Sequence, residues 1–347
     1  MLRPAGTVSQ RACDNDAMTS VTPTVDDLEA MRGRLTAFCY RMLGSAADTD
    51  DAVQETIIRA HGALDRFDPA RGQLSTWMHR IAANICIDLA RSAARRELAV
   101  DLGPARTRAD SADLGEPLPA DRFVEPMPDA AVICADDPAD IVAQRQSVRL
   151  AFVAALQCLA PRQRATLLLR EVLGFDAAET ADILDTSVPA VNSALQRARA
   201  RLSAAAPEPL AQQSLADPDQ QRLLDDYVAA FEAHDVGGLK RVLREDLRMS
   251  MPPFAWRLES REEFLAVFAA ADACVGDRLL RVPINGTAGF GQYRREGDVL
   301  HPFALVVPEI RDGAIAEIVT FLGTGDRFAE FGLPLRLEPG SVPPGRR

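Results

Sequence analysis

Two blocks of helical periodicity, separated by a proline-rich segment, are the strongest constraint on how this chain can fold. Residues 25–98 and 141–204 carry apolar side chains at helical spacing. Between them, at 99–140, prolines recur and acidic residues outnumber basic ones, a composition that is typical of linkers without a packed core. The chain is therefore predicted to be multidomain, with two all-α units joined by an acidic linker.

Composition narrows the classes of protein that need to be considered. The 347 residues suffice for two or three domains, and 39 Lys and Arg against 50 Asp and Glu give a net charge of −11. That charge argues against a protein that coats nucleic acid non-specifically, so any DNA contact must come from local basic faces. No apolar run is long enough for a membrane span and no signal peptide is recognisable, which predicts a cytoplasmic protein without a membrane partner. The six cysteines lack metal-binding spacing, so we expect buried thiols, no metal and no cofactor.

The first helical block contains an amphipathic helix with an acidic outer face. Its apolar residues recur at three- and four-residue spacing and form one buried stripe: Ala52, Val53, Thr56, Ile57 and Ala60. The opposite face then carries Asp51, Gln54 and Glu55. From periodicity alone, this face is either a solvated surface or a binding surface, and both interpretations stay open.

The next predicted helix, at about 74–96, has arginines at its C-terminal end and an asparagine, Asn84, among apolar residues. Arg91 and Arg95 near its end could neutralise DNA phosphates, which supplies affinity but no sequence readout. Asn84 carries the donors and the acceptor that base recognition needs, although an Asn bonded within a helix bundle would look the same. Trp77 and Ile81 line the same helix, and Trp77 also suits the core.

The second block ends in a helix-turn-helix. Asp176 and Glu179 have the spacing of a capping box that opens its first helix, and 184–187 supply the turn. On the second helix, Val191, Leu195 and Ala198 must face the core. The outer face then carries side chains suited to major-groove edges and phosphates: Asn192, Ser193, Gln196, Arg197 and Arg199.

These motifs together resemble the extracytoplasmic-function (ECF) sigma factors of bacterial RNA polymerase. The resemblance rests on LGSAADTDDAVQET at 43–56, STWMHRIAAN at 75–84 and VNSALQRAR at 191–199. It implies that 25–98 is sigma region 2 and that 141–204 is region 4. It further implies that Asp51, Gln54 and Glu55 bind the core polymerase, which contributes its β′ and β subunits.

The same resemblance assigns the DNA contacts. It implies that Asn84 holds a base flipped from the minus-ten element, with Trp77, Ile81, Arg91 and Arg95 as neighbouring contacts. The helix-turn-helix would read the minus-thirty-five element. Promoter opening would then follow from base capture, without nucleotide hydrolysis.

A third unit, at 217–335, differs from the two helical blocks because its sequence predicts strands as well as helices. Helices come first and are followed by alternating strands with Gly turns such as Arg311-Asp-Gly313, an order that resembles the SnoaL-like, ketosteroid-isomerase-like cone of α+β class. Met251 and Ala304 stand where such isomerases place carboxylates, so no catalytic residues are predicted. Several large side chains of this unit could line a pocket for a small apolar ligand or could simply fill the core, and both interpretations stay open: Tyr227, Met251, Trp256, His301 and Phe303.

The leading hypothesis is an ECF sigma factor that initiates transcription and is regulated by a C-terminal SnoaL-like domain. The alternative is a ligand-sensing or enzymatic SnoaL-like protein fused to a DNA-binding module. A linker is expected at 205–216, with disordered tails at 1–24 and 336–347. The sequence does not indicate whether an anti-sigma factor exists.

Overall fold

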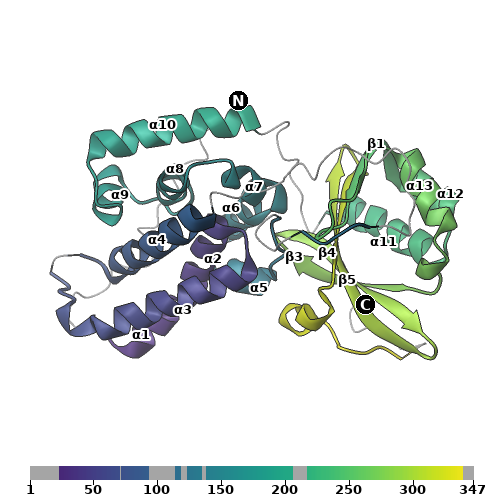
Figure 1. The fold of residues 1–347 in the computed structure, drawn as a ribbon, viewed down its shortest axis with the longest axis horizontal. Coiled ribbons are helices and arrows are strands. Elements are labelled where there is room, and N and C mark those ends of the chain that lie inside the picture. The colour runs from purple at the N-terminus through teal and green to yellow at the C-terminus, as the bar shows by residue number, and fades with distance from the viewer. Residues whose placement is uncertain are drawn as a thin grey trace. The chain divides into compact units, whose positions relative to one another are not determined.

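The chain forms two compact units in the computed structural model, which describes residues 23–70, 72–93, 114–118, 123–134, 138–205 and 217–338. The helical unit comprises Met1–Leu98 and Ala130–Pro209, and the cone unit comprises Ala99–Asp129 and Leu210–Arg347 (Figure 1). The predicted N-terminal tail, the joint at 205–216 and the C-terminal tail lie almost wholly outside the described residues. Within the described ranges, no helix is both long and apolar enough to cross a bilayer.

Four helices form the first part of the helical unit: α1 (Val25–Ala30), α2 (Arg32–Leu43), α3 (Ala46–Gly62) and α4 (Leu74–Ala93), with a short 3₁₀ turn, η2 (Leu64–Arg66), after α3. Local caps set their ends. Thr24 and Asp27 form a reciprocal capping box on α1, and the Ser45 hydroxyl accepts from the backbone of Asp48 at the start of α3. Gly44 ends α2 in the left-handed conformation (φ 74°) that glycine adopts without strain.

The second part of the helical unit contains six helices and one π-helical turn: α5 (Asp129–Val132), α6 (Pro138–Val148), α7 (Leu150–Gln157), α8 (Pro161–Leu167), η4 (Leu168–Val172), α9 (Ala177–Ile183) and α10 (Val188–Ala205). The predicted capping box is present, because the Asp176 carboxylate accepts from the backbone of Ala178 and Glu179 at 2.7 and 2.9 Å. The turn that follows α9 contains Asp185 at φ 48°. Helix α9, this turn and α10 are the predicted helix-turn-helix.

One apolar core runs through both parts of the helical unit. It joins Leu35 and Phe38 of α2 and Ala82 of α4 to Leu168 and Leu195 of the second part. Helix α4 contacts α8 and α9, and α2 contacts α7 (Figure 1). The expectation of two separate helical domains at 25–98 and 141–204 therefore differs from the structure, since each part completes the core of the other.

His79 lies within this shared core. Its ring, on α4, lies edge-on to Phe38 of α2 at 5.5 Å and to Phe175, just before α9, at 5.3 Å between ring centroids. The side chain is 2% exposed, its Nδ1 is 2.8 Å from the carbonyl oxygen of Ser75, and its Nε2 has no hydrogen-bond partner among the described residues. Burial lowers the pKa of His79 to about 4, because the apolar surroundings disfavour the charged imidazolium.

Two of the cysteines are also part of this core, as expected for buried thiols. Cys39 and Cys86 are fully buried. Cys158, by contrast, is exposed, and Cys134 and Cys274 are partly exposed, so the expectation does not hold for these three.

The cone unit is a curved six-stranded sheet with helices on one face. The strands are β1 (Leu243–Ser250), β2 (Arg257–Leu258), β3 (Arg278–Ile284), β4 (Thr287–Glu296), β5 (Val299–Arg311) and β6 (Ala314–Leu322), in the order β2-β1-β6-β5-β4-β3. Among the strands of the described residues, only the β1–β6 pairing is parallel. Helices α11 (Pro218–Glu232), α12 (Val236–Val242) and α13 (Arg261–Ala270) enclose an aromatic core with the sheet. The predicted α+β cone is thus the observed fold.

Two hairpins of the cone use the expected turn chemistry. Asn285-Gly286 joins β3 to β4 and Asp312-Gly313 joins β5 to β6, and all four residues have positive φ. Two consecutive residues with positive φ match the right-handed twist of the flanking strands, which explains why Asn or Asp precedes Gly at both turns.

Part of the predicted linker belongs to the cone unit. Val124, Pro126, Met127 and Pro128 are buried, although 99–140 was expected to lack packing. The backbone of Met127 exchanges two hydrogen bonds with Asn285, at 2.8 and 3.0 Å, and the Asp129 carboxylate accepts from Gly286 at 2.7 Å. Proline and acidic content therefore gave a wrong prediction for this segment. An extended segment can be buried and hydrogen-bonded against a sheet even though its own sequence has no helical or strand periodicity.

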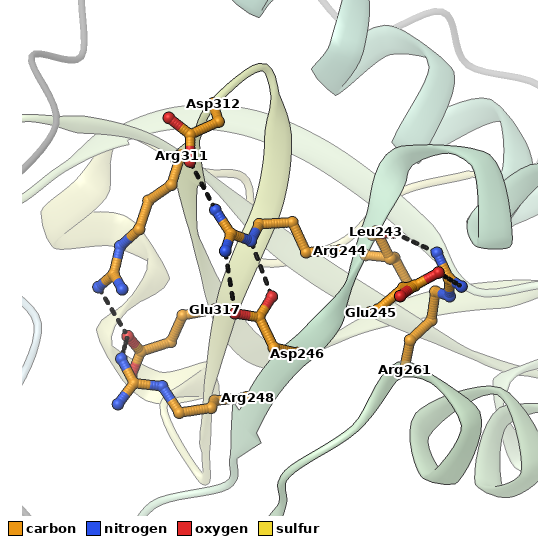
Figure 2. Close-up of polar contacts among 9 residues, drawn as sticks. All are labelled: Leu243, Arg244, Glu245, Asp246, Arg248, Arg261, Arg311, Asp312 and Glu317. Carbon is orange, nitrogen blue, oxygen red and sulfur yellow. Dashed lines mark hydrogen bonds and ion pairs between the residues drawn. The ribbon is translucent and has the colours of Figure 1, made fainter.

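The part of the sheet formed by β1, β6 and the β5–β6 turn carries several ion pairs (Figure 2). Arg244 of β1 pairs with Asp246 at 2.8 Å and with Asp312 at 2.7 Å, and Glu317 of β6 accepts from Arg248 at 3.1 Å. These pairs are largely exposed, so solvent screens them and they contribute little to stability. Their main consequence is that this part of the sheet surface is polar.

His79 makes the stability of the helical unit depend on pH. An unfolded chain protonates this residue below about pH 6.5, whereas the folded unit resists protonation down to about pH 4. Stability is therefore lost as the pH falls through this window, by about 2 kcal/mol between pH 7.5 and 5.0. We expect urea unfolding, followed by Trp77 fluorescence in a Trp256→Phe background, to report this loss.

His79→Phe should remove that part of the pH dependence. The matched control is His61→Phe, which changes an exposed histidine and should leave the pH dependence as it is in the unsubstituted chain. Equal pH dependence in the His79 and His61 variants would contradict this assignment.

Candidate polymerase-binding and DNA-binding surfaces

The polar face of α3 borders a surface groove. Asp51 and Gln54 are exposed, and the Glu55 carboxylate pairs with Arg59 at 2.7 Å. The groove has a volume of about 560 Å³ and also includes Ile58 of α3 and, from α4, Ile85, Asp88 and Leu89. Ile58 is 56% exposed, which is unusual for so large an apolar side chain. The structure thus brings together the three predicted residues and adds an apolar floor.

Sequence reasoning missed the α4 side of this groove. Periodicity along α3 identifies which α3 residues face outward, but it does not identify the neighbouring helix. The exposed Ile58, next to Gln54 and Glu55, was the one signal in the sequence that this face is more than a solvated surface.

The predicted minus-ten residues on α4 differ in their exposure to solvent. Asn84 and Arg91 are exposed. Trp77 and Ile81 are partly buried and pack against the shared core, with the Trp77 ring 5.1 Å from that of Phe67. Arg95 lies outside the described residues. Asn84 therefore has the solvent access that base recognition requires.

The α10 surface carries the predicted minus-thirty-five residues on one side. Val191, Leu195 and Ala198 are buried, and the outer residues are exposed: Asn192, Ser193, Gln196, Arg197 and Arg199. The Arg199 Nε is 2.5 Å from the carboxylate of Glu171 on η4. Glu171 was not predicted, since it lies in a different element, and it orients one predicted DNA contact.

The predicted pocket residues of the cone fall into two groups. Tyr227, Met251 and Trp256 belong to the aromatic core, where the Tyr227 ring lies 5.9 Å from Phe290. Burial raises the pKa of the Tyr227 hydroxyl well above its usual range. His301 and Phe303 are partly exposed at the start of β5, where the guanidinium of Arg294 covers the Phe303 ring.

An isomerase-type pair of carboxylates has no counterpart at the matching positions of this cone. Met251 is partly buried against the core, and Ala304 and Leu305 are fully buried on β5. General-base chemistry on a carbon acid needs a carboxylate or a similar group at such a position. These residues cannot supply one.

Comparison with known families gives a match for each part of the helical unit. Residues 28–96 match the family model of Sigma-70 region 2, and residues 149–202 match that of Sigma-70 region 4. The first match includes α3 and α4, and the second includes the helix-turn-helix.

Comparison with individual proteins covers most of the chain. It is 42% identical to the ECF RNA polymerase sigma factor SigG of Mycobacterium tuberculosis over 314 residues, which is 88% of this chain and 82% of SigG. It is 28% identical to SigJ of the same organism over 64% of this chain and 63% of SigJ. The crystal structure of M. tuberculosis SigJ aligns with 90% of this chain and all of that one, with a TM-score of 0.56 at 19% identity, which shows a shared fold. These relatives are named as ECF sigma factors, and the chain belongs to the ECF RNA polymerase sigma factors.

Proposed function

We propose that this sigma factor binds core RNA polymerase through the α3–α4 groove and that the β′ subunit is the main contact there. The proposal is supported by the combination of Asp51, Gln54 and Glu55 with the exposed Ile58. Interface centres pair apolar contact with polar groups at the rim, which is the arrangement found in this groove. The relative SigG is named as a polymerase sigma factor, and on that basis we expect this chain to act with polymerase in the cytoplasm.

In this proposal, promoter recognition is divided between two surfaces. Asn84 captures an extruded base of the minus-ten element while Arg91 and Arg95 contact phosphates, and Trp77 and Ile81 support the base from the helix side. The α10 surface reads the minus-thirty-five element in the major groove. This assignment of two surfaces is supported by the polar side chains of α4 and α10, which are exposed while the apolar side chains of both helices lie in the shared core.

The cone unit regulates these steps through the linker, in the same proposal. Residues 123–129 connect the two DNA-reading regions along the chain and are held by Asn285, Gly286 and Arg327 of the cone. Release of this segment would lengthen the free chain between the regions. A small, largely apolar ligand that carries one hydrogen-bond acceptor is a candidate signal at Tyr227, Met251 and Trp256, since the buried Trp256 indole N–H has no partner among the described residues.

The groove assignment predicts a binding defect without a folding defect. Asp51→Ala combined with Gln54→Ala changes exposed side chains, so the free energy of unfolding should shift by less than about 0.5 kcal/mol. Affinity for core polymerase should fall at least tenfold, measured by fluorescence anisotropy. The control Asp182→Ala removes an exposed acid from α9 and should bind normally. Normal affinity of the double variant would refute the assignment.

The DNA-reading assignment predicts two different defects. Asn84→Ala should suppress promoter opening in permanganate footprinting and relax the choice of minus-ten bases. Arg199→Ala should instead weaken closed-complex binding and reduce its salt dependence by about one unit of slope. Arg201→Ala, on the same helix, is the matched control. Normal opening by the Asn84 variant on the same promoters would exclude base capture.

The regulatory assignment predicts that loosening the linker changes transcription. Asn285→Gly keeps the positive φ of the hairpin but removes the side-chain acceptor for Met127. It should increase amide exchange at Met127 and change transcription rates severalfold in either direction. Asp312→Gly alters an equivalent hairpin that does not bear on the linker and should leave the rates unchanged. The contradicting result is an Asn285→Gly protein in which Met127 exchanges faster but transcription is the same as for the unsubstituted chain. The cone would then not act through the linker.

A further inference from the structure

One arginine on the outer face of α10 is paired with an acid from outside the helix-turn-helix. The Nε of Arg199 lies 2.5 Å from a carboxylate oxygen of Glu171, and the two side chains are 63% and 35% exposed. In the part of the chain that the structure describes, Arg197 and Arg201 of the same helix have no carboxylate within ion-pair distance. A specific acidic partner therefore distinguishes Arg199 from the neighbouring arginines.

The backbone that carries Glu171 is held in place independently of this pair. Glu171 belongs to the π-helical turn η4, in which the N–H of Leu173 donates to the carbonyl of Leu168 at 2.9 Å. The N–H of Phe175 donates to the carbonyl of Leu169 at 3.0 Å, and both leucines are fully buried in the shared core. Single π-helical turns are rare and are frequent at functional sites. Backbone bonds and core packing consequently set the position of Glu171.

The main consequence of the ion pair is geometric, because solvent screens an exposed pair and leaves it little weight in folding. A guanidinium has N–H donors on three nitrogens, arranged in one plane. A carboxylate at the Nε of Arg199 occupies the side of that plane and leaves the two Nη groups as a fork at its end. A fork of this kind can bond two oxygens of one phosphate. Glu171 thereby restricts how Arg199 can meet DNA.

Glu171 also places a negative charge beside the predicted DNA contact. Phosphates attract an arginine whatever the base sequence, and such contacts supply most of the non-specific affinity for DNA. The carboxylate next to Arg199 repels phosphates that approach the guanidinium from its side and leaves the end of the fork accessible. Repulsion of the wrong geometries is a general way to gain specificity at the expense of affinity.

From this geometry we propose that Glu171 is a positioning residue for promoter recognition. It restricts Arg199 to one phosphate contact and thereby fixes the register of α10 on the minus-thirty-five element, since phosphate contacts set the position from which base edges are read. The inference rests on the proposed function of the α10 surface. It assigns specificity to a residue that acts through Arg199. In this arrangement Glu171 lowers affinity for arbitrary DNA more than affinity for the element.

Removal of the charge with little change of shape tests this role. Glu171→Gln is assembled, as the full-length chain, with core polymerase. Closed-complex affinity is then measured on a promoter from which the holoenzyme initiates, with its minus-thirty-five element either intact or scrambled. The ratio of the two affinities should fall at least threefold, mainly because the scrambled promoter binds more tightly. Asp182→Asn removes an exposed charge from α9 and should leave the ratio unchanged.

An Arg199→Ala background separates positioning from a structural role. There the effect of Glu171→Gln should disappear, since no guanidinium remains to be positioned, whereas damage to η4 would persist. A ratio that is unchanged in Glu171→Gln, or that falls equally with and without Arg199, would overturn the inference. If Arg199→Ala itself leaves closed-complex binding as in the unsubstituted chain, the proposed function of α10 fails instead, so the two outcomes are distinguishable.

The ion pair can also be observed without DNA. In NMR spectra of the full-length chain, the Nε–H of Arg199 should exchange with solvent more slowly than that of Arg201, because a carboxylate accepts its proton. Glu171→Ala should make the Arg199 exchange at least threefold faster and leave the Arg201 exchange as it was. Equal exchange of the two arginines in the unsubstituted chain would contradict the pair on which the positioning role depends.

Discussion

The apolar core shared by regions 2 and 4 governs the rest of the helical unit. Helices α2, α3 and α4 each bury one stripe, and the residues that complete this core, such as Leu168, Leu169 and Leu195, come from the second part of the unit. Buried apolar area contributes about 25 cal/mol per Å², so a core of this extent supplies most of the stability. The polar residues are consequently displaced to the outer faces of α3, α4 and α10, which are the surfaces suited to polymerase and DNA.

The cone unit combines a six-stranded sheet with three helices around an apolar core. Its sheet and helices enclose aromatic side chains in the manner of an isomerase cone, yet Met251 and Ala304 stand at the positions that would need acids. What this cone does instead is bind a stretch of the chain itself. Val124 and Met127 are buried on it, and Asn285 supplies the backbone-like hydrogen bonds that an extended segment requires.

This arrangement connects the two units through the covalent chain. The segment held by the cone is the same one that joins region 2 to region 4. In the proposed function, its release lengthens the chain available between the α4 and α10 surfaces. The cost of restraining a longer loop grows only slowly with length, whereas reach grows in proportion to it. In the proposed function, a modest change in cone–linker affinity would therefore alter the reach of the chain between the two regions.

The sequence by itself determined the local structure: the capping box at Asp176, the outward face of α10, the acidic face of α3 and the glycine turns of the cone. Each depends on residues within a few positions of one another. Only the tertiary structure decided that regions 2 and 4 share a core, that Arg41 and Arg164 are buried, and that Met127 pairs with Asn285. An apolar stripe has the same periodicity whichever partner covers it, and an arginine or a proline-rich strand becomes buried only through partners more than one hundred residues away.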